Sequence, residues 1–162
     1  MSVNRLNGEE RLVENLFDFD CAAEVKQRVA ALTPEQQRQW GKMSVAQMLA
    51  HCSKGVEMAA GETNPPRAAI GRILGLIVKP MVLRDGEPMR KNSPTIRELI
   101  TDEAADFDTE RARLNRLIDQ FRAVGPVGCT SHPHPFFGRL APEEWAQLMY
   151  KHLDHHLRQF GV

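Results

Sequence analysis

The chain has 162 residues and a mass of 18.3 kDa, enough for one domain that buries a hydrophobic core. Its hydrophobic fraction of 42% and charged fraction of 26% are typical of a globular protein. Lys and Arg together number 21, as do Asp and Glu, so the formal net charge is zero. The composition therefore lacks the basic excess of a nucleic-acid-binding protein.

Cysteine usage and hydropathy indicate a cytoplasmic protein. The three cysteines form no CxxC pair, which is typical of reduced thiols, and residues 1–20 lack the apolar core of a secretory signal. The most apolar stretch, residues 70–83, is interrupted by Arg72, Lys79 and Pro80 and is shorter than a bilayer span of about 20 residues. It could form a dimer face or a membrane-surface segment, but we expect a buried helix and no membrane partner.

Helical periodicity and capping residues predict three helical segments in the first part of the chain. A helix over residues 21–32 follows Asp20 as its N-cap, and Thr33 begins a short helical turn that Gly41 closes. The next helix, over residues 44–60, is expected to begin with a capping box, in which the side chains of Ser44 and Gln47 each accept a hydrogen bond from the other's backbone N–H.

The second part of the chain also reads as helical. We expect a helical piece over residues 68–78 that is kinked or ended at Pro80, and two longer helices over residues 108–124 and 142–160. The connection over residues 61–107 is long enough to let the helices on either side of it run parallel. Strand signals are weak. The sequence therefore predicts an all-α single domain over residues 1–162, with residues 1–17 as a loosely ordered N-terminal extension.

Two histidines near the C-terminus are the strongest functional signal. His152 and His156 lie four residues apart, so they share one helix face with Trp145, Leu148 and Met149, which points inward. Buried imidazoles need partners for both ring nitrogens, and a divalent metal ion supplies one for each ring. The spacing therefore favours a metal site inside the bundle.

His51 is the natural third ligand. It lies seven residues after Ser44, about 10 Å along its helix, whereas His152 and His156 lie on average about 9 Å from Phe160. If the helices over residues 44–60 and 142–160 are antiparallel neighbours, all three histidine rings lie at the same height in the bundle. The alternatives are a hydrogen-bonded core histidine at position 51 and a histidine pair that complements the helix dipole.

The pattern differs from the zinc-protease motif, which requires a glutamate directly after the first histidine as general base. Leu153 occupies that position, and Asp154 points to the other side of the helix, where we expect a surface charge. Hydrolysis by that mechanism is therefore disfavoured.

Residues 40–51 and 152–160 resemble the DinB-like superfamily, and residues 134–140 resemble one of its uncharacterised, domain-of-unknown-function branches. The resemblance covers nearly the whole chain after Leu16. It implies a four-helix bundle in up-down-down-up order with a zinc or nickel ion on His51, His152 and His156. Several relatives are thiol-dependent transferases or isomerases that use glutathione, mycothiol or bacillithiol, and dimers are common among them, so a homodimer is expected here.

Three hypotheses for function follow. A metal ion on three neutral histidines keeps an open position, which favours a low-molecular-weight thiol that attacks a small-molecule substrate. The second hypothesis is a non-enzymatic module in which the metal stabilises the bundle or is sensed. The third is a metal-hydroxide hydrolase, which would need an acid or base such as His134 or His155.

Further residues are candidates for the surroundings of the metal. Gly55 lies one turn after His51 and leaves room either for a ligand or for close helix packing. Gln47 and Gln159 face the same way, although the capping box already explains Gln47. In the loop over residues 132–139, Phe136 and Phe137 could wall a pocket above the metal or simply plug the end of the bundle. Cys52 points away and is expected to be a small core residue.

Overall fold

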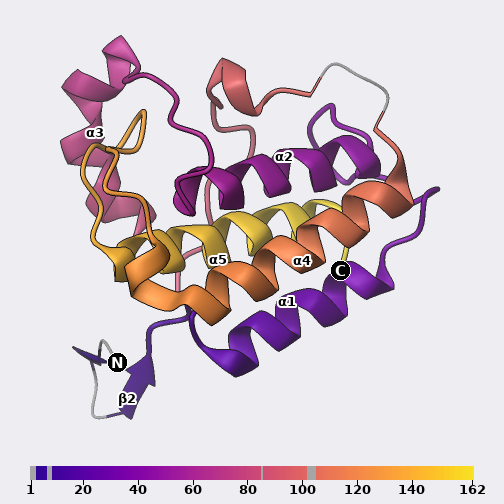
Figure 1. The fold of residues 1–162 in the computed structure, drawn as a ribbon, viewed down its shortest axis with the longest axis horizontal. Helices are drawn as coiled ribbons and strands as arrows, with labels where there is room; N and C mark the ends of the chain where they lie inside the picture. The colour runs from indigo at the N-terminus through magenta and orange to yellow at the C-terminus, as the bar shows by residue number, and fades with distance from the viewer. Residues whose placement is uncertain (1–2, 7–8, 85, 102–104) are drawn as a thin grey trace.

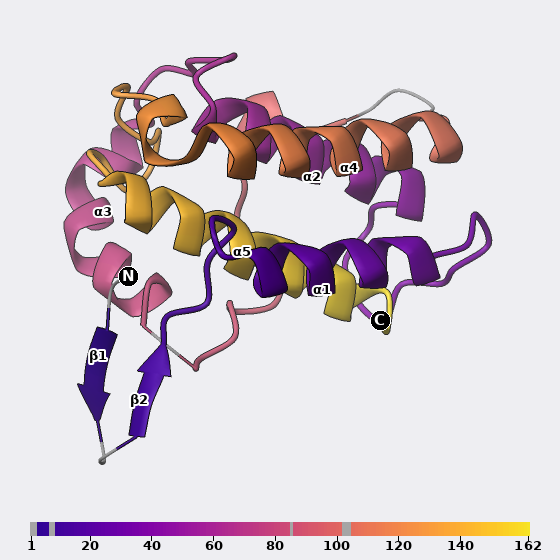
Figure 2. The same cartoon turned by 60° about the horizontal axis from the view of Figure 1, so that its bottom comes forward.

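The computed structural model describes residues 3–6, 9–84, 86–101 and 105–162, and the fold is all-α, as predicted. Two short 3-10 helices, η1 (Arg97–Leu99) and η2 (Gly125–Gly128), lie in the connections. An antiparallel hairpin of β1 (Val3–Leu6) and β2 (Glu9–Leu12), which the sequence did not predict, projects from the helical body (Figure 2). The α-helices in the described ranges are α1 (Phe19–Ala31), α2 (Val45–Ala59), α3 (Ala69–Val82), α4 (Phe107–Val124) and α5 (Pro142–Gln159).

Helices α1, α2, α4 and α5 form a four-helix bundle in which α1 and α2 each pack against both α4 and α5. Figure 1 shows α1 and α5 running in one direction and α2 and α4 in the other. The order is therefore up-down-down-up, and the long connection that carries α3 returns the chain to the end where α2 began. As a result, α2 and α4 are parallel, whereas α2 and α5 are antiparallel neighbours.

The bundle core is built from one apolar stripe on each helix. Val25 and Val29 of α1 and Leu114 and Ile118 of α4 are fully buried or nearly so, at the three- and four-residue spacings of a helix face. Leu16 also reaches the core, and its backbone N–H donates to the carbonyl of Ala146 on α5 at 3.1 Å. The chain preceding α1 is thereby attached to α5.

Two local predictions were wrong. Asp18, not Asp20, caps α1, because its carboxylate accepts the backbone N–H groups of Asp20 and Cys21 at 3.0 and 3.1 Å. The segment after Thr33 is not helical but consists of a hydrogen-bonded turn and bends. Its polar groups bond to the end of α5 instead, because the backbone N–H of Gln39 donates to the carbonyl of Gln159 at 2.7 Å. Tertiary partners replace the helical hydrogen bonds there.

The largest departure from expectation is α3. It continues through Pro80 to Val82, and its apolar side chains are exposed, with Ile73 at 75% and Leu76 at 79% of their full accessibility. The prediction of a buried helix was therefore wrong. In Figure 1, α3 lies across one end of the bundle instead of inside it. Within the described part of the chain, every helix falls short of the length and apolarity that crossing a bilayer requires.

We expect Asp18→Ala to lower the free energy of unfolding by about 1 kcal/mol, because two helix N–H groups lose their acceptor. Asp20→Ala is the matched control, since Asp20 is an exposed acidic residue in the first turn, where the helix dipole contributes a few tenths of a kcal/mol. Urea denaturation measures both variants. Equal losses would contradict the assignment of the cap.

Candidate metal centre

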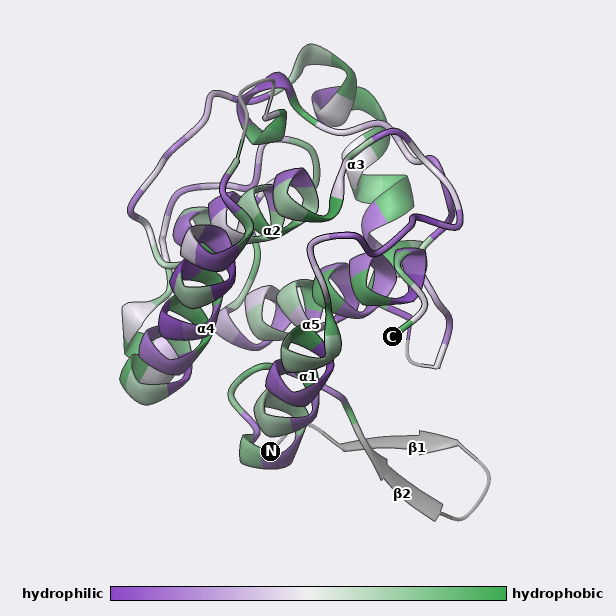
Figure 3. Cartoon of the chain, turned by 90° about the vertical axis from the view of Figure 1, so that its right-hand side faces the viewer, coloured by the Kyte–Doolittle hydropathy of each residue, from purple (hydrophilic) through white to green (hydrophobic). Residues whose placement is uncertain are grey.

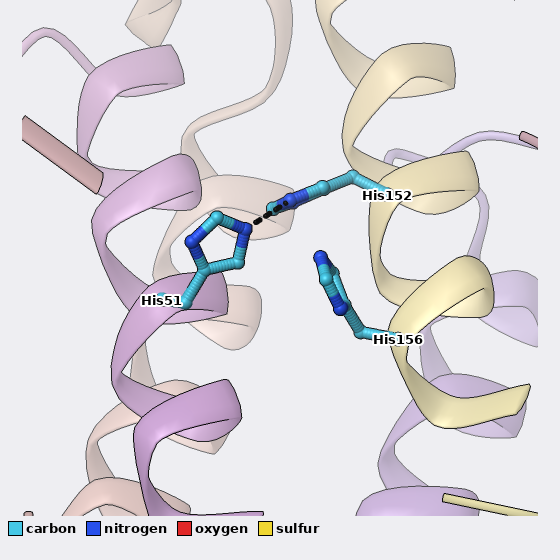
Figure 4. A group of neighbouring side chains, drawn as sticks. All are labelled: His51, His152 and His156. Atoms are coloured by element: carbon cyan, nitrogen blue, oxygen red, sulfur yellow. Dashed lines mark hydrogen bonds between the residues drawn. The ribbon is translucent and has the colours of Figure 1, made fainter. Parts of the chain in front are cut away.

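The antiparallel packing of α2 and α5 brings three histidines together. His51 lies on the inner face of α2, and His152 and His156 lie one turn apart on α5 (Figure 4). The ring centroid of His51 lies 4.8 Å from that of His152 and 4.7 Å from that of His156. The ring centroids of His152 and His156 are 4.7 Å apart. The convergence expected from the depth of each residue along its helix is therefore observed.

The ring nitrogens also point to one place. One nitrogen from each ring lies within 4.8 Å of the other two, and the Nε2 atoms of His51 and His152 are 2.8 Å apart. Imidazole nitrogens at such separations can share one divalent ion. Among the residues that the structure describes, this candidate cluster consists of three imidazoles, without a carboxylate or a thiolate.

Backbone and amide groups fix the tautomers of two rings. The Nδ1 atom of His51 lies 3.0 Å from the carbonyl oxygen of Leu99, which only accepts, so Nδ1 carries the proton. The Nδ1 atom of His156 lies 2.9 Å from Oε1 of Gln159, whose amide nitrogen donates to the carbonyl of Trp40 at 2.7 Å. That second bond orients the amide, so His156 also donates from Nδ1. Both rings therefore direct an Nε2 lone pair into the cluster.

Counting donors shows that the residues fit a cation. If His152 is protonated on Nε2, its single N–H can satisfy one of the two lone pairs that His51 and His156 present. One lone pair then stays unpaired in a desolvated place, which is costly. A metal ion accepts all three lone pairs at once, so the donor set matches a metal better than it matches hydrogen bonding alone.

Burial also keeps the three rings neutral. It lowers the pKa of His51, lowers that of His152 well below its ordinary value, and lowers that of His156 to about 3. The neighbouring histidines act in the same direction. Neutral imidazole is the form that binds a metal, so no proton has to leave these rings near neutral pH.

Gly55 makes room for the ring of His152. A Cβ atom at position 55 would lie 3.2 Å from both Cε1 and Nδ1 of that ring. Of the two roles considered for this glycine, the structure shows close helix packing: the missing side chain lets the ring of His152 on α5 lie against α2. The same close packing leaves Nδ1 of His152 buried and without a hydrogen-bond partner among the described residues.

The loop over residues 131–139 packs next to the cluster. Nδ1 of His134 accepts the backbone N–H groups of Phe136 and Phe137, both at 3.1 Å, and its ring lies 5.3 Å from that of Trp145. Burial lowers the pKa of His134 to about 4, with a smaller contribution from Arg67. Phe137 stacks on His134 at 4.6 Å, so these aromatic residues close one end of the bundle.

The other candidates lie beside the cluster but outside it. Gln47 accepts the backbone N–H of Ser44 at 2.9 Å, which completes the predicted capping box. His155 packs its ring edge against Trp40 and lies 5.0 Å from the ring of His156. Cys52 is buried in the core, and burial raises the pKa of its thiol.

Sequence reasoning did not identify two groups of the site, the carbonyls of Leu99 and Trp40. Both belong to segments between the bundle helices, η1 and the turn before α2. A backbone carbonyl carries no residue signature, so only the tertiary structure could reveal them.

A cavity of about 300 Å³ lies on the other face of α5 and contains none of the three histidines. Asp154 is also on that face, held by Arg28 and Arg158 at 2.9 Å each. Its carboxylate is therefore turned away from the metal centre, as predicted from its helix position. The cavity is lined by Glu14, Gly86, Glu87, Pro88, Met89, Gln147, Tyr150, Lys151, Asp154 and Arg158.

A family model described as "Protein of unknown function (DUF1569)" matches residues 13–161 of the chain. Searches of the curated proteins and of the solved structures gave no match.

We expect Gly55→Ala to weaken metal binding by about tenfold or more, because the added methyl group displaces the ring of His152. Alanine is also the better helix former, which offsets part of the cost of moving that buried ring, so we expect the variant to stay folded. Competition with a chromophoric chelator measures the dissociation constant.

Ser53→Ala is the matched control on the same helix. It removes a buried hydroxyl that has no hydrogen-bond partner among the described residues and lies away from the cluster. An unchanged metal affinity in Gly55→Ala would show that the ring of His152 does not depend on this glycine.

Proposed function

We propose that this chain, which belongs to the DUF1569 family, binds a divalent metal ion on three histidines and uses it to activate a low-molecular-weight thiol. One observation carries the proposal: the anchored rings of His51 and His156 direct two Nε2 lone pairs at the place that His152 also reaches. Without a cation, a single N–H of His152 can satisfy only one of these two lone pairs.

The ligand chemistry favours zinc or nickel. Imidazole nitrogens suit transition metals, whereas calcium and magnesium require oxygen ligands. Three neutral rings leave the ion its full charge of +2 and a free coordination position, as in catalytic zinc sites. An anionic ligand is the natural occupant of that position.

A thiol fits this site better than a hydrolytic water. When bound, a divalent ion would lower the pKa of a thiol beside it, so that the nucleophile forms without a separate general base. The two histidines that could serve a hydrolase are not presented as a free acid or base: Nδ1 of His134 accepts two backbone N–H groups, and the ring of His155 packs against Trp40. Asp154 pairs with two arginines. We therefore place hydrolysis last.

The resemblance of residues 40–51 and 152–160 to the DinB-like superfamily supports the same proposal. Relatives in that superfamily include transferases that use glutathione, mycothiol or bacillithiol. We infer that the chain is a divergent member. A thiol cosubstrate also suits a reducing, cytoplasmic compartment, and the cysteines of the chain are all unpaired.

A second candidate is a non-enzymatic role in which the metal stabilises the bundle. The burial of His51, at 3% exposure, and the position of the described cavity on the opposite face of α5 favour it. In that case the metal-free protein melts far lower than the loaded protein, and thiol-transfer and hydrolysis assays both show no turnover.

We expect His51→Ala and His156→Ala each to remove most of the bound metal, because two imidazoles hold a divalent ion much more weakly than three. Elemental analysis of untagged, folded protein measures metal per chain. His132→Ala is the matched control, because the ring of His132 contacts the carbonyl of Pro133 in its own loop. A full metal content in either cluster variant would refute the site.

We expect cobalt-substituted protein to develop a sulfur-to-metal charge-transfer band when a cellular thiol is added. The band should be absent from His156→Ala protein treated in the same way. If glutathione, mycothiol and bacillithiol all leave the spectrum unchanged while cobalt stays bound, the thiol proposal fails and the structural role of the metal remains.

A further inference from the structure

The outer face of α3 is a continuous apolar surface. Its apolar side chains recur at helical spacing and are exposed, with Ile73 at 75% and Ile77 at 66%. Figure 3 shows α3 as a largely hydrophobic helix at the edge of the bundle. An exposed, contiguous apolar face on one helix marks an interaction site. We define this outer face by Ile70, Ile73, Leu74, Leu76, Ile77 and Met81. We propose that it docks on an anionic membrane surface.

Close backbone packing fixes which side of α3 faces outward. Gly71 and Gly75 are the buried residues of the helix, and a Cβ atom at position 71 would lie 2.6 Å from the Cα atom of Phe136. Only glycine allows this approach, so the glycine edge must face the loop that carries Phe136. The apolar side chains on the opposite side are therefore directed to solvent by the fold itself.

Polar bonds at both ends of α3 hold the same orientation. The backbone N–H of Ala68 donates to the carbonyl of Pro135 at 3.0 Å. Near the other end, the ammonium group of Lys79 donates to the carbonyl of Arg139 at 3.1 Å and pairs with Glu144 at 2.7 Å. Rotating α3 to bury its apolar face would break these contacts, so the outer face is a built feature of the molecule.

The charge of the segment identifies the partner. No aspartate or glutamate occurs between Glu62 and Asp85, whereas four basic residues do, in a chain whose formal net charge is zero. Arg72 and Arg84 are exposed at the two ends of the outer face. An apolar helix face with basic residues beside it is the pattern of a helix that lies in the interface of an anionic bilayer.

A second copy of the chain fits the same face less well. In a symmetric dimer each outer face would meet its own counterpart, whose sequence has no carboxylate between Glu62 and Asp85, while Glu87 just beyond it already pairs with Arg84 of the same chain at 3.4 Å. Lipid phosphates supply that opposite charge, and the arginine stems can lie along the apolar surface while their guanidinium groups reach the phosphates. The charges therefore favour a lipid surface over a second copy.

Vesicle sedimentation tests the inference with the full chain, with and without added zinc. We expect stronger binding to equimolar phosphatidylcholine and phosphatidylserine vesicles than to phosphatidylcholine alone, and weaker binding as salt is raised. The double variant I73S/I77S should reduce partitioning by at least about tenfold, and R72Q should reduce it by about fivefold.

Val127→Ser is the matched control, because Val127 is 92% exposed and lies in η2 instead of α3. It should bind vesicles like the original protein, and circular dichroism should show equal helix content in all variants. Failure to bind the mixed vesicles would overturn the inference, as would equal losses in V127S and I73S/I77S. A lipid-free dimer that I73S/I77S converts to monomers would assign the face to a second copy. Elemental analysis of the bound metal tests the proposed histidine site separately, whatever these vesicle experiments show.

Discussion

The pairing of α2 with α5 places three imidazoles in one desolvated space, and much of the structure follows from that constraint. Polar groups removed from water need partners, and here two backbone carbonyls outside the two helices supply or orient them. The carbonyl of Leu99 holds His51, while the carbonyl of Trp40 orients Gln159, which in turn holds His156. Segments between the bundle helices thus set the direction of ring nitrogens inside the bundle.

Helix α5 connects the separate parts of the molecule. Its inner face carries two of the clustered histidines, while its outer face carries Asp154, which pairs with Arg28 of α1. Near its start, Trp145 packs against the ring of His134, in the loop that also seats the glycine edge of α3.

The two proposals describe a consistent protein. The proposed thiol chemistry would suit a reducing compartment, and the cytoplasmic leaflet of a membrane that faces such a compartment is rich in anionic lipid. The metal centre lies between α2 and α5, whereas the outer face of α3 points away from the bundle (Figures 1 and 4). The two proposals therefore concern different parts of the chain, and each can be tested without the other.

The sequence alone determined the helical class, the four bundle helices and the three histidines, because helix periodicity places His152 and His156 on one face and caps locate His51 along its helix. It could not determine the cap of α1, the turn after Thr33 or the exposure of α3. Asp18 and Asp20 are equally good caps in isolation, and the turn depends on bonds to the distant end of α5. Periodicity shows that α3 is apolar, but whether an apolar face meets the core or solvent depends on what its glycine edge contacts. Here that contact is the backbone at Phe136, more than sixty residues away in sequence, and only the tertiary structure brings the two together.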